Sequence, residues 1–251
     1  MGFSFFLPSF FFRGDNYHCN ICGFRARKFL QRGHDYPVIT ELEIIGAGKR
    51  EVDCPKCGSS DRDRLIYEYF KSKFSPEELI GKKMLHVAPE KALSKKLASE
   101  FQLDIVKIDL RTKGYLFVYD KSVIHANVMD LPFESNFFDF IICNHVLEHV
   151  QNVATALSEI HRTLKSGGTA ITQVPLSLKI PQTLEGEISW NKHERIEKLG
   201  QFDHLRLFGA DFEEHLKTAK LFPIYWTMNN LELKQKLKLG NDEFIIASKK
   251  H

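Results

Sequence analysis

Two pairs of cysteines lie in the first sixty residues and are spaced as metal ligands. Two residues separate Cys19 from Cys22, two separate Cys54 from Cys57, and a glycine follows each pair. This spacing lets both thiolates of a pair face one ion, and the glycine permits the tight backbone turn. Four soft ligands favour tetrahedral zinc, with iron as the alternative. Because protein side chains fill every position, we expect a structural metal rather than a catalytic one.

Three histidines are the candidate catalytic residues. His145 and His149 lie in one segment with Glu148, and His204 follows further along the chain. A neutral imidazole can accept a proton near neutral pH, as a general base must. If the segment begins a helix, His145, Glu148 and His149 share one face and alternatively hold a divalent ion. A purely structural role is the other interpretation of His149.

A charged cluster formed by Asp203, His204 and Arg206 is the candidate substrate-binding segment. Arg206 can pair with a carboxylate or phosphate of the substrate, bidentately where the geometry permits. The cluster can equally be a structural ion network. The polar stretch before it belongs to residues 176–208, which we interpret either as a lid or as a surface insertion.

The hydrophobic pattern predicts the elements that position these residues. From residue 82 onwards apolar stretches alternate with amphipathic ones, which is typical of an α/β fold with a doubly wound, mostly parallel sheet. We expect strands at residues 83–87, 104–108, 123–126, 138–143, 169–174, 222–228 and 243–248. We expect helices at residues 62–74, 90–100, 153–164 and 210–219, with a Ser-Gly-Gly turn at 166–168 ending the third.

The chain divides into two parts in this interpretation. Residues 1–61 contain both cysteine pairs and short alternating stretches such as 37–45, which predicts a small β-rich zinc-knuckle subdomain. Residues 62–251 form the sheet domain, with the lid or insertion at 176–208 inside it.

The ends of the first two strands of the domain predict a cofactor site. In a doubly wound sheet, ligands collect at the carboxyl ends of the strands. Val87, Ala88, Pro89 and Glu90 close the first strand, where Ala88 is small enough for close approach and Pro89 suits the first turn of a helix. Asp109 closes the second strand, where a carboxylate can accept both hydroxyls of a ribose.

Four further segments, in their usual order, resemble the class I methyltransferases that use S-adenosylmethionine. These segments are residues 130–133 (Asp-Leu-Pro-Phe), 138–139 (Phe-Asp), 146–149 (Val-Leu-Glu-His) and 164–168 (Leu-Lys-Ser-Gly-Gly). The chain is most similar to the type 11-like methyltransferases, in a subgroup that has Ala-Pro-Glu in place of the usual glycine turn. That subgroup also carries paired cysteines before the domain and a Gly-Gln-x-Asp-His-x-Arg segment behind it, found here at residues 200–206.

The resemblance implies S-adenosylmethionine as cofactor and a seven-stranded sheet whose final strand is antiparallel. It implies that Val128 and Met129 line the adenine ring and that Asp130 binds its amino group. Asn144 and His145 would border the methionine portion. The missing glycines leave open a non-catalytic, zinc-containing interaction protein with a degenerate cofactor site.

The function that we expect is transfer of a methyl group to oxygen on a small hydroxylated metabolite or sugar. An RNA methyltransferase is a further alternative. It is disfavoured because a net charge of +3 and a pI near 8.5 are mild for a protein that tracks phosphates.

Two other features place the protein in a compartment. The apolar start of the chain, residues 1–12, lacks basic residues at its beginning and is too short to span a bilayer. Five cysteines without a secretion signal favour a reducing compartment, and we expect the cytoplasm. Cys143 lies alone in an apolar strand and is expected to be a buried, inert thiol.

Overall fold

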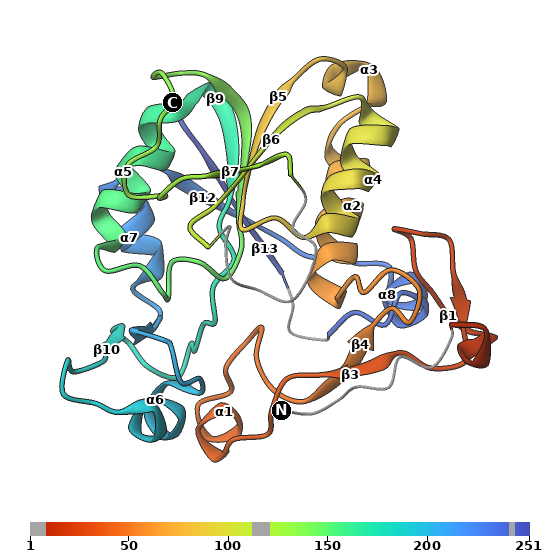
Figure 1. The fold of residues 1–251 in the computed structure, drawn as a ribbon, viewed down its shortest axis with the longest axis horizontal. Coiled ribbons are helices and arrows are strands. Elements are labelled where there is room, and N and C mark those ends of the chain that lie inside the picture. The colour runs from red at the N-terminus through yellow and green to blue at the C-terminus, as the bar shows by residue number, and fades with distance from the viewer. Residues whose placement is uncertain (1–8, 112–120, 241–243) are drawn as a thin grey trace.

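A seven-stranded sheet forms the centre of the molecule (Figure 1). The computed structural model describes residues 9–111, 121–240 and 244–251, so the first eight residues of the apolar start and Glu243 of the expected last strand lie outside it. The strand order is β12-β13-β9-β8-β5-β6-β7. The strands are β5 (Lys83–Val87), β6 (Asp104–Asp109), β7 (Val123–His125), β8 (Phe138–Cys143), β9 (Leu164–Ile171), β12 (Phe222–Trp226) and β13 (Ile245–Lys249).

The direction of the strands confirms the expected fold class. Strands β5 to β9 pair in parallel, whereas β13 pairs antiparallel with both β9 and β12. The carboxyl ends of the parallel strands therefore meet at one edge, and the antiparallel strand β13 lies between β9 and β12.

Helices cover both faces of the sheet (Figure 1). Helices α2 (Asp61–Lys73) and α4 (Lys91–Phe101) lie on one face with α3 (Pro76–Leu79) beside α4, and α5 (Val153–Thr163) and α7 (Phe212–Thr218) lie on the other. Strand β8 serves both layers: Phe140 and Ile142 pack with α2 and α4, whereas Ile141 and Cys143 pack with α5 and α7. Burial raises the pKa of the Cys143 thiol, which therefore stays protonated.

The N-terminal unit consists of η1 (Ser9–Phe12), β1 (Arg13–His18), β2 (Arg25–Ala26), β3 (Leu30–Arg32), α1 (Pro37–Glu41) and β4 (Arg50–Asp53). Its strands form two antiparallel pairs, β1 with β2 and β3 with β4. The prediction of an extended stretch at residues 37–45 is wrong, because α1 forms there. Pro37 occupies the first turn of the helix, and Val38 and Ile39 are buried in a cluster with Leu199 and Leu207.

Residues 176–208 are more regular than the polar sequence suggests. They contain β10 (Leu184–Glu185), α6 (Lys192–Leu199) and β11 (Arg206–Leu207). Helix α6 begins with a capping box, in which Asn191 accepts from the backbone of Glu194 and the Glu194 carboxylate accepts from the backbone of Asn191. The helix ends at Gly200 and packs against α1 (Figure 1). The hypothesis that this segment is a lid stays a prediction.

The Ser-Gly-Gly turn at residues 166–168 does not end α5, contrary to expectation. The helix ends at Thr163, and Leu164 already has an extended backbone and begins β9. Gly167 has a φ of 74° and its amide donates to the carbonyl of Lys250. The turn residues therefore shape an irregular start of β9 rather than the end of the helix, and β9 ends at Ile171 rather than at Val174.

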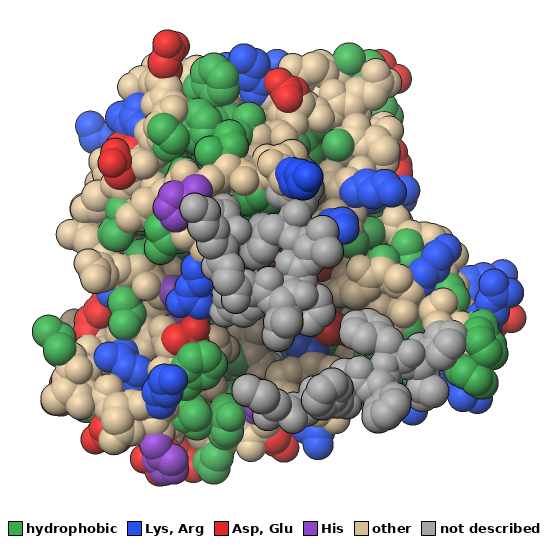
Figure 2. Space-filling view, in the orientation of Figure 1, with side chains coloured by type: hydrophobic (Ala, Val, Ile, Leu, Met, Phe, Trp, Pro, Cys, Tyr) green, Lys and Arg blue, Asp and Glu red, His purple; other side chains and the backbone are tan. Residues whose placement is uncertain are grey.

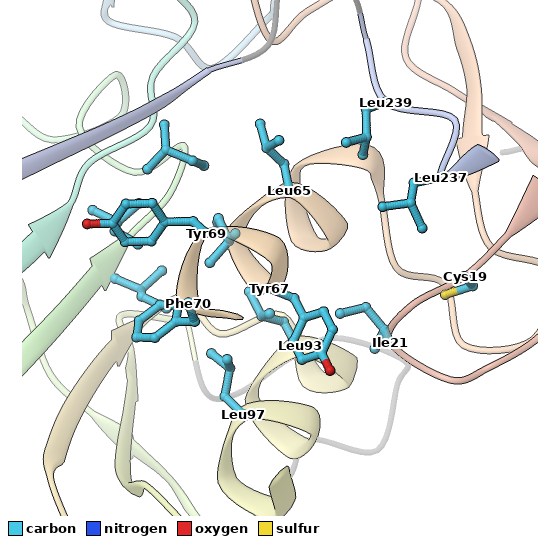
Figure 3. Packing of buried hydrophobic residues seen from close by; sticks show 14 of the residues in the cluster. Cys19, Ile21, Leu65, Tyr67, Tyr69, Phe70, Leu93, Leu97, Leu237 and Leu239 are labelled. Atoms are coloured by element: carbon cyan, nitrogen blue, oxygen red, sulfur yellow. The ribbon is translucent and has the colours of Figure 1, made fainter. Parts of the chain in front are cut away.

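One cluster of buried side chains joins the N-terminal unit to the sheet domain. Figure 3 shows α2 carrying Leu65 and Tyr69 into this cluster, which also contains Ile21 from the N-terminal unit and Leu237 from the C-terminal segment. Helix α8 (Leu231–Lys236) precedes Leu237 and lies beside β1. The apolar core is therefore continuous across the boundary that the sequence suggested at residue 61.

Arg64 of α2 is fully buried at this junction. Its guanidinium donates to the carbonyls of Val52, Ser59 and Leu237, each at 2.8 Å, and stacks 4.6 Å from the centre of the Phe29 ring. Burial lowers the pKa of Arg64, while nearby acidic groups and thiols oppose the shift. One side chain thus bonds the N-terminal unit, α2 and the segment before β13.

Replacement of this arginine tests its role. Arg64→Met should lower the free energy of unfolding by about 3 kcal/mol or more, because three buried carbonyls lose a charged donor. Urea denaturation measures the change. Arg25→Met is the control: the Arg25 side chain is 66% exposed, and its loss should change the stability by less than about 0.5 kcal/mol. Equal effects of both variants would contradict the assignment.

Candidate functional site

The four cysteines converge as the sequence predicts. The sulfur atoms of Cys19 and Cys57 are 3.7 Å apart, as are those of Cys22 and Cys54, and all four lie within 4.8 Å of one another. Tetrahedral zinc with metal–sulfur bonds of about 2.3 Å requires sulfur atoms about 3.8 Å apart. The arrangement therefore fits a tetrathiolate metal site.

The two cysteine turns have the same backbone hydrogen bonds. The amide of Gly23 donates to the carbonyl of Cys19, and the amide of Gly58 donates to that of Cys54. Both glycines have a positive φ, 70° and 72°, which favours glycine over residues with a side chain. The Ser59 hydroxyl lies 3.2 Å from the sulfur atoms of Cys19 and Cys57, where it can donate to a thiolate. The site is therefore built from two matching turns.

A cavity of about 650 Å³ lies at the carboxyl ends of β5, β6 and β8, and we call it the strand-end cavity. Six residues expected at a cofactor site line it: Val87, Ala88, Asp109, Val128, Met129 and His145. Asp109 ends β6, and its carboxylate accepts from the backbone of Arg111 at 2.8 Å. The rest of the wall of the strand-end cavity is largely apolar. The volume and the mixed lining are those of a site for a small organic ligand.

The turn after β5 keeps a glycine-like backbone although it contains no glycine. Ala88 has a φ of 48°, in the left-handed region, and its amide donates to the carbonyl of Ile108 on the neighbouring strand. An alanine in this conformation costs roughly 1–2 kcal/mol. The small side chain therefore preserves a tight turn at the wall of the strand-end cavity.

Four other residues expected at the cofactor site do not line this cavity. Pro89 and Glu90 follow the turn, and the Glu90 carboxylate bonds His86 at 2.7 Å and Asn144 at 3.4 Å. Asn144 is buried, whereas Asp130 is exposed just beyond the lining residues Val128 and Met129. Their assignment to cofactor binding stays a prediction.

A second cavity of about 490 Å³ lies between the N-terminal unit and the sheet domain, and we call it the interface cavity. The N-terminal unit and the start of α2 contribute His34, Arg50 and Arg62. His145 and His149 line both cavities, so the two cavities adjoin at these side chains. His34, Arg50 and Arg62 were missed as site residues because no local motif connects them with the end of β8.

The segment 145–149 is a turn rather than the start of a helix. His145 has a φ of 49°, and its amide donates to the carbonyl of Gln173 at 2.7 Å. The turn still gathers the expected side chains: Nδ1 of His145 is 3.4 Å, and Nε2 of His149 3.9 Å, from Oε1 of Glu148. Burial lowers the pKa of His145 well below its usual range and raises that of Glu148 to about 8.

His204 joins this group, although it is 55 residues further along the chain than His149. Its ring lies edge-on to that of His149, with 5.0 Å between the ring centres, and it lines the interface cavity with Glu148. Burial, together with His149, lowers the pKa of His204 to about 4. The three candidate catalytic histidines therefore surround the Glu148 carboxylate.

The other two residues of the charged cluster lie differently. Asp203 lines the strand-end cavity, and its carboxylate is 3.7 Å from Nδ1 of His149. Arg206 lines neither cavity: it is buried, donates to the carbonyls of Leu147 and Val150, and pairs with Glu185 at 2.9 Å. Those contacts hold the turn at residues 145–149 in place and leave binding of substrate by Arg206 a prediction.

The central part of the chain matches a known protein family. Residues 82–172 match the family model described as a methyltransferase domain. The chain is similar to that family over these residues, which are about a third of its length. They contain strands β5 to β9 and the turn at 145–149, and therefore most of the strand-end cavity.

Individual relatives match shorter segments. An uncharacterized protein of Methanocaldococcus jannaschii is 51% identical over 51 residues, which are 20% of this chain and 22% of that protein. A demethylmenaquinone methyltransferase of Oceanobacillus iheyensis is 30% identical over 77 residues, 31% of this chain and 32% of the relative. The chain thus matches about a third or less of the length of these curated relatives.

A solved structure shows the same fold over a larger part of the chain. Phosphoethanolamine N-methyltransferase 2 of Haemonchus contortus, in complex with S-adenosyl-L-methionine, superposes with a TM-score of 0.50 at 16% identity. The match covers 77% of this chain and 53% of that protein. The sheet domain of this chain therefore has the class I methyltransferase fold.

The turn after β5 can be tested by substitution. Ala88→Gly should leave the free energy of unfolding unchanged or raise it by up to about 1 kcal/mol, because glycine tolerates a positive φ. Ala88→Val should lower it by more than about 2 kcal/mol, since a β-branched side chain is strained there. Urea denaturation measures both. Ala98→Gly within α4 is the control and should lower the stability by about 1 kcal/mol; the same sign at both sites would contradict this account.

Proposed function

We propose that the protein is an S-adenosylmethionine-dependent methyltransferase that methylates oxygen on a small hydroxylated metabolite or sugar. The cofactor binds in the strand-end cavity and the acceptor in the interface cavity. The observation that carries this proposal is that His145 and His149 line both cavities. A methyl donor and an acceptor in these cavities would meet at the two histidines, and positioning supplies much of the acceleration in such a transfer.

The residues of the strand-end cavity suit the cofactor. Asp109 offers a carboxylate to ribose hydroxyls at the end of β6, and Val128 and Met129 offer apolar surface to an adenine ring. Asn127 adds a polar edge that the sequence interpretation did not include. The solved relative from Haemonchus contortus holds the same cofactor in the same fold, which supports the assignment.

His145 is the group that we assign to proton removal. S-adenosylmethionine bound in the strand-end cavity would supply the methyl group. Its carbon–sulfur bond would break, with the electron pair passing to sulfur, as the acceptor oxygen bonds to the carbon. The proton of the acceptor hydroxyl passes to His145, which is neutral because burial lowers its pKa well below the usual range. The Glu148 carboxyl group lies 3.4 Å from Nδ1 of His145.

The interface cavity favours a small polar acceptor over a nucleic acid. Its walls come from the loop after β3, the start of α2 and the turn at 145–149, and its volume of about 490 Å³ suits a metabolite. Lys and Arg side chains are interspersed with Asp and Glu over the described part of the face in Figure 2. None of the described helices is long and apolar enough to cross a membrane.

Binding of the reaction product S-adenosylhomocysteine tests the proposed cofactor site. Isothermal titration calorimetry should show one site per chain, weakened at least about tenfold by Asp109→Asn through loss of charged hydrogen bonds. Asp104→Asn is the control, because Asp104 is exposed at the opposite end of the same strand. If the wild-type protein does not bind S-adenosylhomocysteine, the non-catalytic interaction protein replaces this proposal.

We also propose that the four cysteines hold structural zinc. The purified protein should contain zinc, and its removal by a strong chelator should lower the melting temperature by at least about 10 °C, since a bound structural metal contributes several kcal/mol. Cys57→Ser should lose that zinc, whereas Cys143→Ser should keep it. Metal analysis with thermal unfolding measures both effects. An unchanged melting temperature after complete removal would refute a structural role.

A further inference from the structure

The Glu148 carboxylate is buried without a hydrogen-bond donor. The side chain is 1% exposed, and neither carboxylate oxygen accepts a hydrogen bond from any residue in the described part of the chain. A buried carboxylate without donors is costly, so such a group generally signals a missing proton, cation or ligand. Glu148 lines the interface cavity, where a cation from solvent can reach it.

Two imidazoles beside Glu148 are oriented by backbone carbonyls. Nδ1 of His149 lies 3.1 Å from the carbonyl of Asp203, and Nδ1 of His204 lies 3.2 Å from the carbonyl of Leu199. A carbonyl can only accept, so Nδ1 carries the proton in both rings and Nε2 presents a lone pair. This arrangement is the usual one for histidines that bind metals, whose second nitrogen is fixed by a carbonyl or carboxylate.

The three side chains converge on one point. Each of Glu148, His149 and His204 offers one ligand atom, and these atoms all lie within 4.8 Å of one another. Metal bonds to nitrogen and oxygen are about 2.0–2.2 Å long, so small side-chain rotations bring the three atoms around one cation. When Glu148 gives up its proton to a cation, the group contains only acceptors: two nitrogen lone pairs and a carboxylate.

The charged groups around Glu148 do not supply the missing cation. Nδ1 of His145 lies 3.4 Å from Glu148, and the Asp203 carboxylate 3.7 Å from His149. The Arg206 guanidinium donates instead to the carbonyls of Leu147 and Val150. Arg50 and Arg62 line the same cavity, where Arg50 pairs with Asp61 at 2.9 Å and Arg62 with Glu90 at 3.7 Å. None of these described guanidinium groups donates to the Glu148 carboxyl group.

We propose that Glu148, His149 and His204 bind a divalent transition-metal cation at the wall of the interface cavity. Two imidazoles and one carboxylate suit Fe²⁺, Co²⁺, Ni²⁺ or Zn²⁺ and leave coordination positions open. This site is separate from the four cysteines. It differs from the His145, Glu148 and His149 set that the sequence suggested, because the segment is a turn and His204 reaches it from a distant loop.

The metal site deepens the proposed function and rests on it. An open coordination position facing the interface cavity would bind an oxygen of the acceptor and lower the pKa of its hydroxyl, which eases transfer of that proton to His145. Two open positions would favour an acceptor with two neighbouring oxygens, as in a sugar diol. The cation therefore narrows the acceptor class within small hydroxylated metabolites.

Titration with Co²⁺ tests the site. The four-cysteine cluster is first filled with one equivalent of zinc, which thiolates prefer, and Co²⁺ is then followed by visible absorption. We expect one equivalent of Co²⁺ to bind with ligand-field bands and without the intense sulfur-to-cobalt charge-transfer bands of a thiolate site. Glu148→Gln and His204→Gln should each weaken this binding at least tenfold.

The controls separate this inference from the proposed function. His193 forms a similar pair with Glu197 at 3.4 Å on the exposed face of α6, so His193→Gln should leave Co²⁺ binding unchanged. S-adenosylhomocysteine binding by both site variants shows that they are folded, because neither residue lines the strand-end cavity. Wild-type protein that binds S-adenosylhomocysteine but no Co²⁺ beyond the sulfur site overturns the metal site alone. Unchanged Co²⁺ affinity in folded Glu148→Gln overturns it as well.

Discussion

The buried guanidinium of Arg64 is the constraint on which the arrangement of the two cavities depends. A buried cation is tolerated only where dipoles or anions surround it, and here the carbonyls of Val52, Ser59 and Leu237 do so. These carbonyls come from the end of β4, the turn after the second cysteine pair and the segment before β13. The hydrogen bonds of this one side chain therefore fix the N-terminal unit against the sheet domain.

The four-cysteine cluster and Arg64 both hold the second cysteine turn, at residues 54–57, in place. The sulfur atoms bring the turn at 19–22 against that at 54–57, and the carbonyls that accept from Arg64 flank the second turn. The loop that carries His34 and Arg50 lies between the two turns in sequence and forms a wall of the interface cavity. Metal binding at the cysteines would therefore shape the acceptor side of the site although it lies outside the chemistry.

The parts of the structure predicted from sequence are those that depend on local pattern. Strands β5 and β8 begin and end where their apolar residues do, and the cysteine turns follow from spacing and glycine. Contacts between distant parts of the chain explain what the sequence did not predict. Helix α1 forms where alternation suggested a strand, because Val38 and Ile39 pack against the α6 region. For Arg206 the sequence did not reveal the hydrogen bonds to the carbonyls of Leu147 and Val150, because these belong to a distant turn.

The backbone at two positions explains how a site without the usual glycines can still form. Ala88 and His145 both have left-handed φ values, 48° and 49°, at the ends of adjacent strands β5 and β8. Such conformations cost energy and persist where surrounding hydrogen bonds determine them, here to Ile108 and Gln173. Ala88 turns the chain tightly beside the strand-end cavity, and His145 directs its ring to the boundary of both cavities. The strained turns after β5 and β8 thus bring His145, the base that we propose, to the place where the two cavities adjoin.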